Sequence, residues 1–204
     1  MDFLKIIFSI AIGYLIGSIP FALLIGKGIY GVDVRKAGSF NLGGTNTGRL
    51  LGKKAGISVI VLDALKVPLA VFIVSLFKNE SATIIAGLAA CFGHCYPIFA
   101  QFKGGKAVAS AYGYLLALAI LVTFNPLTFF VPLLVFILFL ALFRMVSLGS
   151  MIGILTAVIF NFIFNDIFIL KISLVVLLIL VVYRHKANIK RIIKGKESKV
   201  SWIK

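Results

Sequence analysis

Two polar, glycine-rich segments hold most of the side chains in this chain that could do chemistry. The first, residues 36–49, contains four glycines, two asparagines and three hydroxyl side chains. Glycines allow successive backbone N–H groups to turn toward one point and form a nest that binds anions. Arg49 could clamp a phosphate or carboxylate with two hydrogen bonds. The pattern predicts an anion site, with an ordinary flexible loop as the alternative.

The second segment, residues 93–106, ends in Lys103-Gly104-Gly105-Lys106, directly before an apolar stretch. If a helix begins there, its unpaired N–H groups, the positive end of its dipole and a lysine all favour an anion. The segment is not a nucleotide P-loop, because Gly-x-x-x-x-Gly-Lys-Ser/Thr occurs nowhere in the sequence. We expect a second anion site here.

Further candidates come from the two histidines, His94 and His185. Imidazole changes its charge near neutral pH, so each is a candidate general base or substrate contact. A buried histidine with satisfied hydrogen bonds is the alternative for His94. Asn188 stands one turn after His185 and could contact the same anion. Ser147 begins an apolar segment, where a simple helix cap is the alternative.

Asp63 and Lys66 lie within an apolar stretch, three positions apart. On a helix this spacing lets the two side chains pair. A charge inside a membrane span is costly unless it is compensated, and it often marks a functional site. The pair is therefore either functional or a structural ion pair.

Motifs of several other reaction types are missing. An acyltransferase His-x-x-x-x-Asp motif would need Asp at position 99 or 190, where Phe99 and Lys190 stand. Neither Gly-x-Ser-x-Gly nor His-Glu-x-x-His occurs. Cys91 and Cys95 beside His94 are not interpreted as a metal site, and no cofactor is expected. A reaction should therefore use an already activated substrate, with the protein supplying placement and electrostatics.

The composition indicates an integral membrane protein. Of the 204 residues 61% are hydrophobic and 13% are charged, and the mean hydropathy is +1.13. Soluble domains average roughly 45–50% apolar and about 25% charged residues. The net charge of +15 would suggest nucleic acid in a soluble protein. Here membrane topology explains it, and no nucleic-acid partner is expected.

Seven apolar segments, separated by short polar breaks, are each close to the ~20 residues that a spanning helix needs. They are residues 3–25, 55–77, 81–100, 107–124, 126–143, 145–165 and 167–183. The first is interpreted as a retained span, since no small-x-small cleavage site follows it. The sequence thus predicts an all-α, polytopic membrane protein with one transmembrane domain, residues 1–204. Five spans are the alternative, should two segments be re-entrant.

The basic residues predict the orientation. Most of the 21 Lys and Arg residues lie in loops 26–54 and 101–106, at Arg144 and in the tail 184–204. With seven spans these regions share one side, and the positive-inside rule makes that side cytoplasmic. We expect the amino terminus outside, the carboxyl terminus in the cytoplasm, and both glycine-rich segments facing the cytoplasm.

The motifs, in their order and spacing, resemble the bacterial acyl-phosphate:glycerol-3-phosphate acyltransferase (PlsY) family along nearly the whole chain. They are residues 17–21 with Lys27, and residues 33–35, 39–49, 52–56, 62–66, 93–97, 102–106, 146–148 and 183–189. Two motifs depart from the family pattern. In the first loop, Phe40 and Gly44 replace Gly and Ala. After Gly-Gly-Lys, Ala107 replaces Gly, a mild change if that residue lies in a helix.

The resemblance implies transfer of a fatty acyl group from acyl phosphate to the 1-hydroxyl of glycerol 3-phosphate. The products would be lysophosphatidic acid and phosphate, in the first step of bacterial phospholipid biosynthesis. The expected partners are these two substrates and membrane lipids. The expected location is the bacterial cytoplasmic membrane, with a monomeric enzyme whose active site faces the cytoplasm. The alternative is a membrane carrier for phosphate or a phosphorylated metabolite, which should place polar residues near the bilayer midplane.

The resemblance and the polar patterns together give a predicted site. The predicted catalytic residues are Ser39, Asn41, Arg49, His94 and His185. The predicted substrate or phosphate contacts are Lys27, Gly43, Thr45, Asn46, Lys103, Gly104, Gly105, Lys106, Ser147 and Asn188. Which segment holds which phosphate is open. The base is open too: it is one of the two histidines or the phosphate group of acyl phosphate itself.

Overall fold

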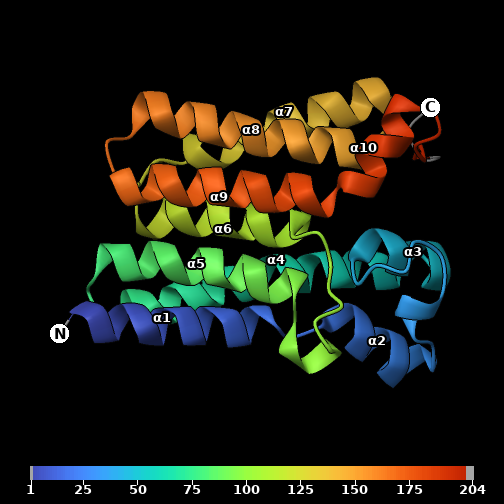
Figure 1. The fold of residues 1–204 in the computed structure, drawn as a ribbon, viewed down its shortest axis with the longest axis horizontal. Coiled ribbons are helices and arrows are strands. Elements are labelled where there is room, and N and C mark those ends of the chain that lie inside the picture. Colours follow the sequence, from blue (N-terminus) through green and yellow to red (C-terminus); the bar gives the residue numbers. More distant parts are fainter. Residues whose placement is uncertain (1, 201–204) are drawn as a thin grey trace. The chain divides into compact units, whose positions relative to one another are not determined.

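The computed structural model describes residues 2–200, which are all-helical with no strand among them. The elements, shown in Figure 1, are α1 (Asp2–Gly17), α2 (Phe21–Tyr30), η1 (Val34–Lys36), α3 (Gly44–Leu51), α4 (Lys53–Ser75), α5 (Glu80–Cys95), η2 (Ile98–Ala100), α6 (Val108–Leu121), α7 (Leu127–Phe143), α8 (Val146–Phe164), α9 (Phe168–Arg184) and α10 (Lys186–Ile193). Each predicted apolar segment contains one long helix, so the all-α prediction is confirmed over these residues.

Four helical stretches are long and apolar enough to cross a membrane: Asp2–Tyr30, Lys53–Ser75, Glu80–Ala100 and Val146–Phe164. A fifth is obtained if α9 and α10, bent by 61°, count as one span. Helices α6 and α7 are apolar but shorter, with 14 and 17 residues. At about 1.5 Å per residue, α6 rises less than the ~30 Å of a hydrocarbon core. The seven-span count therefore stays a prediction that depends on these two helices.

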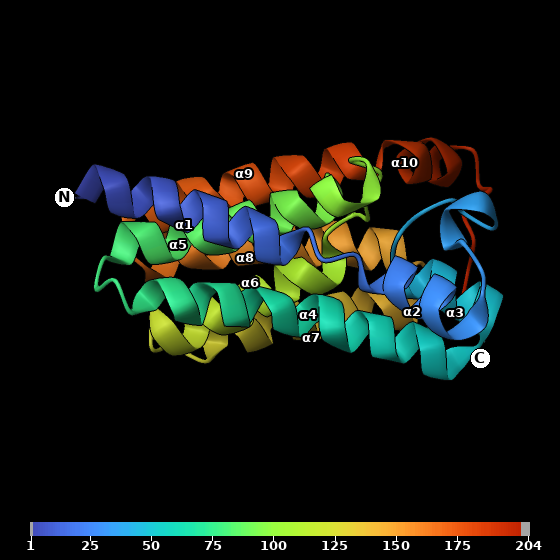
Figure 2. The same ribbon diagram turned by 90° about the horizontal axis from the view of Figure 1, so that it is seen from below.

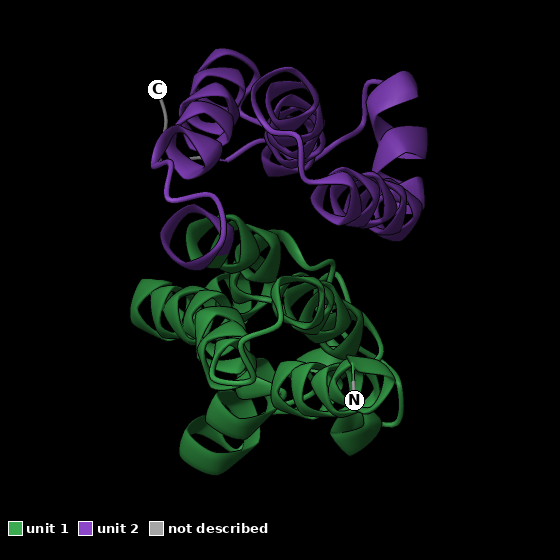
Figure 3. Ribbon diagram, turned by 90° about the vertical axis from the view of Figure 1, so that its left-hand side faces the viewer, with its two compact units in different colours: residues 1–117 green, residues 118–204 purple. Residues whose placement is uncertain are grey.

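The chain forms two compact units, residues Met1–Ala117 and Leu118–Lys204, with the division inside α6 (Figure 3). In the first unit α1 packs along α5, and α2 and α3 pack on α4 (Figure 2). A side chain on Gly13 or Gly17 would overlap the carbonyl oxygens of Ala86 and Ala90 on α5. Small residues of this kind allow membrane helices to approach backbone to backbone.

The first apolar segment is broken, a feature that the sequence prediction of one span over 3–25 missed. α1 ends at Gly17 and α2 begins at Phe21, immediately after Pro20. Proline lacks a backbone N–H and clashes with the preceding helical turn, so a helix breaks near it. The break leaves the carbonyl of Ile19 able to accept a hydrogen bond from Lys66 of α4 at 3.0 Å.

In the second unit α7 packs on α8, α8 packs on α9, and α10 contacts α9. The chain beyond α10 folds back to the turn between α7 and α8. Arg144 accepts a hydrogen bond from Val200 N at 2.8 Å and donates from its guanidinium to Val200 O at 3.3 Å. The end of the described chain is therefore tied to the start of α8.

Candidate functional site

The first glycine-rich segment is organised from inside by Asn46, whose side chain is 1% exposed. Its Nδ2 donates to the carbonyl oxygens of Val34 at 2.9 Å, Asn41 at 3.2 Å and Ala37 at 3.3 Å. Its Oδ1 accepts from Ser39 N at 2.8 Å. The predicted phosphate contact Asn46 thus uses both ends of its amide to hold the loop.

The second half of this segment is not a loop but the short helix α3. Gly43 is the N-cap residue of α3, and its carbonyl oxygen accepts a hydrogen bond from Thr47 Oγ1 at 3.1 Å. A side chain on Gly44 would overlap Ile60 and Gly56 O of α4, and one on Gly56 would overlap Gly48. These glycines let α3 and α4 touch, so part of the glycine pattern serves helix packing rather than an anion nest.

Several predicted site residues lie on the surface of this segment. Ser39, Thr45 and Arg49 are exposed, and Asn41 is partly exposed. Phe40 has φ +56° and is 68% exposed. Because the left-handed region suits glycine, Phe40 adopts a backbone conformation that is uncommon for a bulky residue.

Lys27 is 54% exposed and lies 3.4 Å from Asp33 Oδ2, which Arg35 Nη2 also contacts at 2.8 Å. The hydrogen bond from Arg35 is the main reason that the pKa of Asp33 lies well below its usual value, and Lys27 adds a smaller effect. Arg35 also donates to Ala100 O at 3.4 Å. The predicted phosphate contact Lys27 therefore already has an acidic partner in this structure.

The second glycine-rich segment lies on the carboxyl end of α5. Gly105 N donates to His94 O at 3.0 Å. A side chain on Gly104 would overlap the carbonyl oxygens of His94 and Cys95, and one on Gly105 would overlap His94 Nε2 and Leu42 O. The structure therefore brings the two segments together at Leu42 and Gly105.

The helix after Gly-Gly-Lys begins at Val108 rather than directly at Lys106. Ala107 has φ +57° and its carbonyl accepts from Ala111 N at 2.7 Å. The condition for a mild change at Ala107, a place inside a helix, is therefore not met, since Ala107 stands in the left-handed region just before α6. Lys103 is exposed and Lys106 is half-buried.

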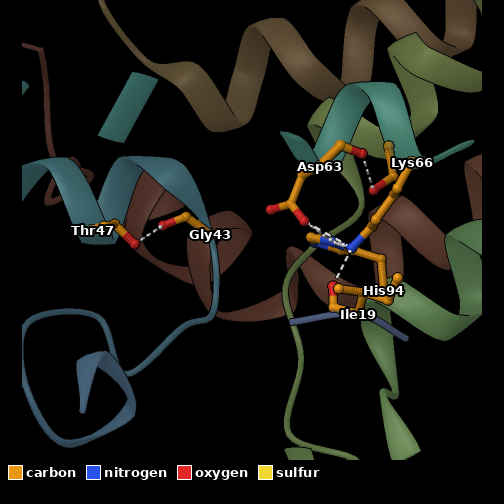
Figure 4. Close-up of polar contacts among 7 residues, drawn as sticks. Ile19, Gly43, Thr47, Asp63, Lys66 and His94 are labelled. Atoms are coloured by element: carbon orange, nitrogen blue, oxygen red, sulfur yellow. Dashed lines mark hydrogen bonds and ion pairs between the residues drawn. The ribbon is translucent and has the colours of Figure 1, made fainter. Parts of the chain in front are cut away.

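A buried polar cluster of Asp63, Lys66 and His94 (Figure 4) adjoins the meeting point through the His94 ring, which faces Gly105. Lys66 Nζ lies 2.7 Å from Asp63 Oδ1 and 3.1 Å from His94 Nδ1. Asp63 Oδ1 and His94 Nδ1 are 3.4 Å apart. The expected helical pairing of Asp63 with Lys66 is confirmed. The cluster lines a small cavity with residues of both halves of the α1–α2 break, namely Gly17, Ile19, Pro20, Phe21 and Ala22, together with Leu42 and Pro97.

In the second unit, two predicted residues, Ser147 and Asn188, and the unpredicted Arg191 surround a carboxylate that the sequence analysis missed. Glu197 Oε1 accepts from Ser147 Oγ at 2.7 Å and from Asn188 Nδ2 at 2.6 Å. Its Oε2 accepts from Arg191 Nε at 2.7 Å. Burial favours the neutral carboxyl, but the hydrogen bonds outweigh it and lower the pKa of Glu197. His185 lies nearby in sequence, with Nδ1 2.8 Å from Val181 O.

The sequence offered one indication that Glu197 makes a specific contact. It is the only acidic residue between Asp166 and the end of the sequence. A lone carboxylate among basic residues is a candidate for a specific contact. For metals, residues 2–200 contain no group of three or more His, Cys, Asp or Glu side chains placed to hold an ion.

Known proteins resemble this chain along nearly its whole length. A family model described as glycerol-3-phosphate acyltransferase matches residues 7–195. Proteins named glycerol-3-phosphate acyltransferase are 47% identical in Geobacillus kaustophilus, covering 94% of each chain, and 47% identical in Bacillus subtilis, covering 95% of this chain and 97% of the relative.

Two crystal structures of the integral membrane glycerol 3-phosphate acyltransferase PlsY (YgiH) have a similar fold. The glycerol 3-phosphate form has a TM-score of 0.88 at 36% identity and covers 96% of each chain. The lysophosphatidic acid form has a TM-score of 0.85 at 35% identity and covers 96% of this chain and 95% of the other.

Proposed function

This chain belongs to the glycerol-3-phosphate acyltransferase family, and from that premise we propose that it acylates glycerol 3-phosphate in a bacterial membrane. The acyl donor is acyl phosphate, and the products are lysophosphatidic acid and phosphate. The two similar crystal structures were obtained in glycerol 3-phosphate and lysophosphatidic acid forms. The relatives described above are named as enzymes, which favours this function over a membrane carrier.

The observation that carries the site assignment is the meeting of the two glycine-rich segments at Leu42 and Gly105. Around it, exposed hydroxyl and guanidinium groups of the first segment and lysines of the second can bind phosphate. Both substrates carry a phosphate, so two anion sites beside each other fit the reaction. In this proposal Ser39, Asn41 and Arg49 contact substrate, while Asn46 shapes the loop that presents them.

The reaction needs little from the protein beyond placement. The 1-hydroxyl oxygen attacks the carbonyl carbon of acyl phosphate, a new ester C–O bond forms, and the C–O bond to phosphate breaks. The hydroxyl proton passes to a histidine or to an oxygen of the departing phosphate. Positive groups held around both phosphates reduce the charge repulsion between the substrates and stabilise the leaving group.

We place the site on the cytoplasmic side of one transmembrane domain with seven spans, an external amino terminus and a cytoplasmic carboxyl terminus. The support is the concentration of Lys and Arg in residues 26–54, 101–106 and 184–204. The enzyme is proposed to act as a monomer. In a variant in which Cys91 and Cys95 are replaced by Ala, a single cysteine is introduced at Ser81 or at Lys199. Its accessibility to a membrane-impermeant reagent, in whole cells and in broken cells, tests the orientation.

The test of function is an assay of the purified protein in detergent with palmitoyl phosphate, with and without glycerol 3-phosphate. We expect phosphate release that depends on glycerol 3-phosphate, with an equal amount of lysophosphatidic acid. Release without the acceptor would indicate a hydrolase, and a folded protein that binds glycerol 3-phosphate without releasing phosphate would indicate a carrier.

The test of the site is Arg49→Gln, for which we expect kcat/KM to fall at least a hundredfold. Lys78→Gln removes the same charge from an exposed turn between α4 and α5 and is the matched control. If folded Arg49→Gln keeps the activity of Lys78→Gln, the assignment of Arg49 to the site is wrong, whatever the reaction.

A further inference from the structure

The ammonium group of Lys66 is buried and has three acceptors around it. Its Nζ lies 2.7 Å from Asp63 Oδ1, 3.0 Å from Ile19 O and 3.1 Å from His94 Nδ1. The side chains of Lys66 and Asp63 are each 3% exposed. An ammonium has three N–H donors and no acceptor, so three acceptors satisfy it completely.

This arrangement determines which nitrogen of His94 carries the proton. Lys66 can only donate, so His94 Nδ1 must accept and cannot itself hold a hydrogen. The proton of the neutral ring is therefore on Nε2. Asp63 Oδ1 lies farther from Nδ1, at 3.4 Å, and already accepts from Lys66 at the shorter distance of 2.7 Å.

The protonated nitrogen points to the place where the two glycine-rich segments meet. A side chain on Gly105 would overlap His94 Nε2 and the carbonyl oxygen of Leu42, so these two atoms border the same small space. The Gly105 amide is also bound to the His94 carbonyl at 3.0 Å. One histidine thus supports Gly105 through its backbone and faces it with its ring.

The charges that hold the ring are compensated locally. Asp63 neutralises Lys66 within the same helix, as a pair with i,i+3 spacing. The Ile19 carbonyl is available because Pro20 breaks the helix after α1. The Phe21 ring lies 5.8 Å from Lys66 Nζ, within range of a cation–π contact. Because Asp63 balances its charge, Lys66 can donate to a neutral ring without leaving an unpaired ion in the helix.

From these contacts we infer that Asp63 and Lys66 are positioning residues that keep His94 in its Nε2–H form, aimed at the junction of the two anion-binding segments. His94 is then a hydrogen-bond donor in the site and not the general base. For the reaction itself this inference rests on the proposed function. It leaves His185 and the departing phosphate as the remaining proton acceptors.

His185 differs from His94 in the ring nitrogen that carries the proton. Its Nδ1 lies 2.8 Å from the carbonyl oxygen of Val181, which can only accept, so Nδ1 carries a proton, and in the neutral ring the lone pair is on Nε2. In their neutral forms the two histidines of the chain are therefore opposite tautomers. Nitrogen-15 NMR of the protein labelled in histidine, at pH 7.5 in detergent, measures both forms directly.

We expect one ring protonated on Nε2 and the other on Nδ1. Signals that disappear in His94→Asn belong to His94 and must be the Nε2–H set. A His94 ring with a proton on Nδ1, alone or together with Nε2, overturns the inference. This result does not depend on acyltransferase activity, so it stands or fails separately from the proposed function.

Two substitutions test what the donor does. The amide nitrogen of Gln reaches the position of His Nε2, whereas that of Asn reaches only the position of Nδ1. We expect His94→Gln to stay within threefold of the native kcat/KM and His94→Asn to lose at least tenfold, mainly as a higher KM for glycerol 3-phosphate. If His94 were the general base, both His94→Gln and His94→Asn would lose activity, because neither amide accepts a proton at neutral pH.

If both folded variants lose activity equally, or if neither does, the donor role is wrong. The double variant Asp63→Leu with Lys66→Met removes both charges at similar volume, which leaves no unpaired ion in the helix. In it we expect a His94 signal from both tautomers and a rise in KM that is smaller than in His94→Asn, because part of the rings still carry the proton on Nε2. A double variant with native KM and an unchanged Nε2–H ring overturns the positioning role.

Discussion

Asn188 Nδ2 donates to Glu197 Oε1 across 2.6 Å, and this bond closes the chain after α10 back onto that helix. Ser147, at the start of α8, shares the same oxygen. Two residues that the family resemblance marked as substrate contacts therefore bind a carboxylate of their own chain. The carboxylate is the point at which the tail, α8 and α10 are held together.

Replacing Glu197 by Ala is expected to lower stability by about 1–3 kcal/mol, because it removes the acceptor that the buried residues Ser147 and Asn188 share. The measurement is the midpoint of thermal unfolding in detergent. Lys196→Ala, an exposed neighbour in the same tail, is the control and should change little. Equal midpoints for the two variants would show that Glu197 does not hold the tail.

The same contact predicts a pH dependence. The pKa of Glu197 is lowered in the folded state, so its stabilising effect is present above the pKa of the unfolded chain and decreases as the pH falls through the folded-state pKa. The difference in unfolding midpoint between the native protein and Glu197→Gln should be largest near pH 7. It should shrink below about pH 4.3, the ordinary value for Glu. A difference that grows on acidification would contradict the sign.

Phe40 stands at φ +56° with its ring 68% exposed. A non-glycine residue in this region costs about 1–2 kcal/mol. Glycine removes this cost, but it also increases the entropy of the unfolded chain, which offsets part of the gain in stability. Phe40→Gly should therefore raise stability by up to about 1 kcal/mol. Phe40→Val should lower it, because branching at Cβ makes this region worse. Thermal midpoints that rank Val above Gly would show that the loop is not held at positive φ.

Gly105→Ala should abolish most activity without unfolding the protein. The added methyl would overlap His94 Nε2 and the Leu42 carbonyl, so the two segments must move apart. We expect kcat/KM to fall at least tenfold. Gly28→Ala, a position in α2 with open space around it, is the matched control and should keep native activity. Similar activity in both variants would show that the close approach at Gly105 is not needed.

The long helices could be predicted from sequence because hydropathy alone specifies them in so apolar a chain. The break at Pro20 was missed, since residues 18–20 do not interrupt the apolar run in composition. Helix α3 was hidden for a different reason. Its glycines disfavour a helix locally, but they allow close packing against Ile60 and Gly56 of α4, a contact that is distant in sequence.

The site was predictable in outline because polar residues are rare here and gather in two segments. The individual roles were less accessible. An asparagine that binds phosphate and one that holds a loop look the same in sequence, and only the bonds of Asn46 to Val34 and Asn41 separate them. Ala107 is the first residue of the predicted span 107–124, whereas its backbone is left-handed and the helix begins at Val108.

The contact between α1 and α5 has a consequence for where a fatty substrate can travel. Gly13 and Gly17 lie against the backbone of Ala86 and Ala90 with no room for even one added carbon atom. A hydrocarbon tail is wider than that, so it cannot part these two helices without separating their backbones. A lipid chain therefore cannot enter the first unit between α1 and α5 at this contact, and the acyl chain must reach the site by another path.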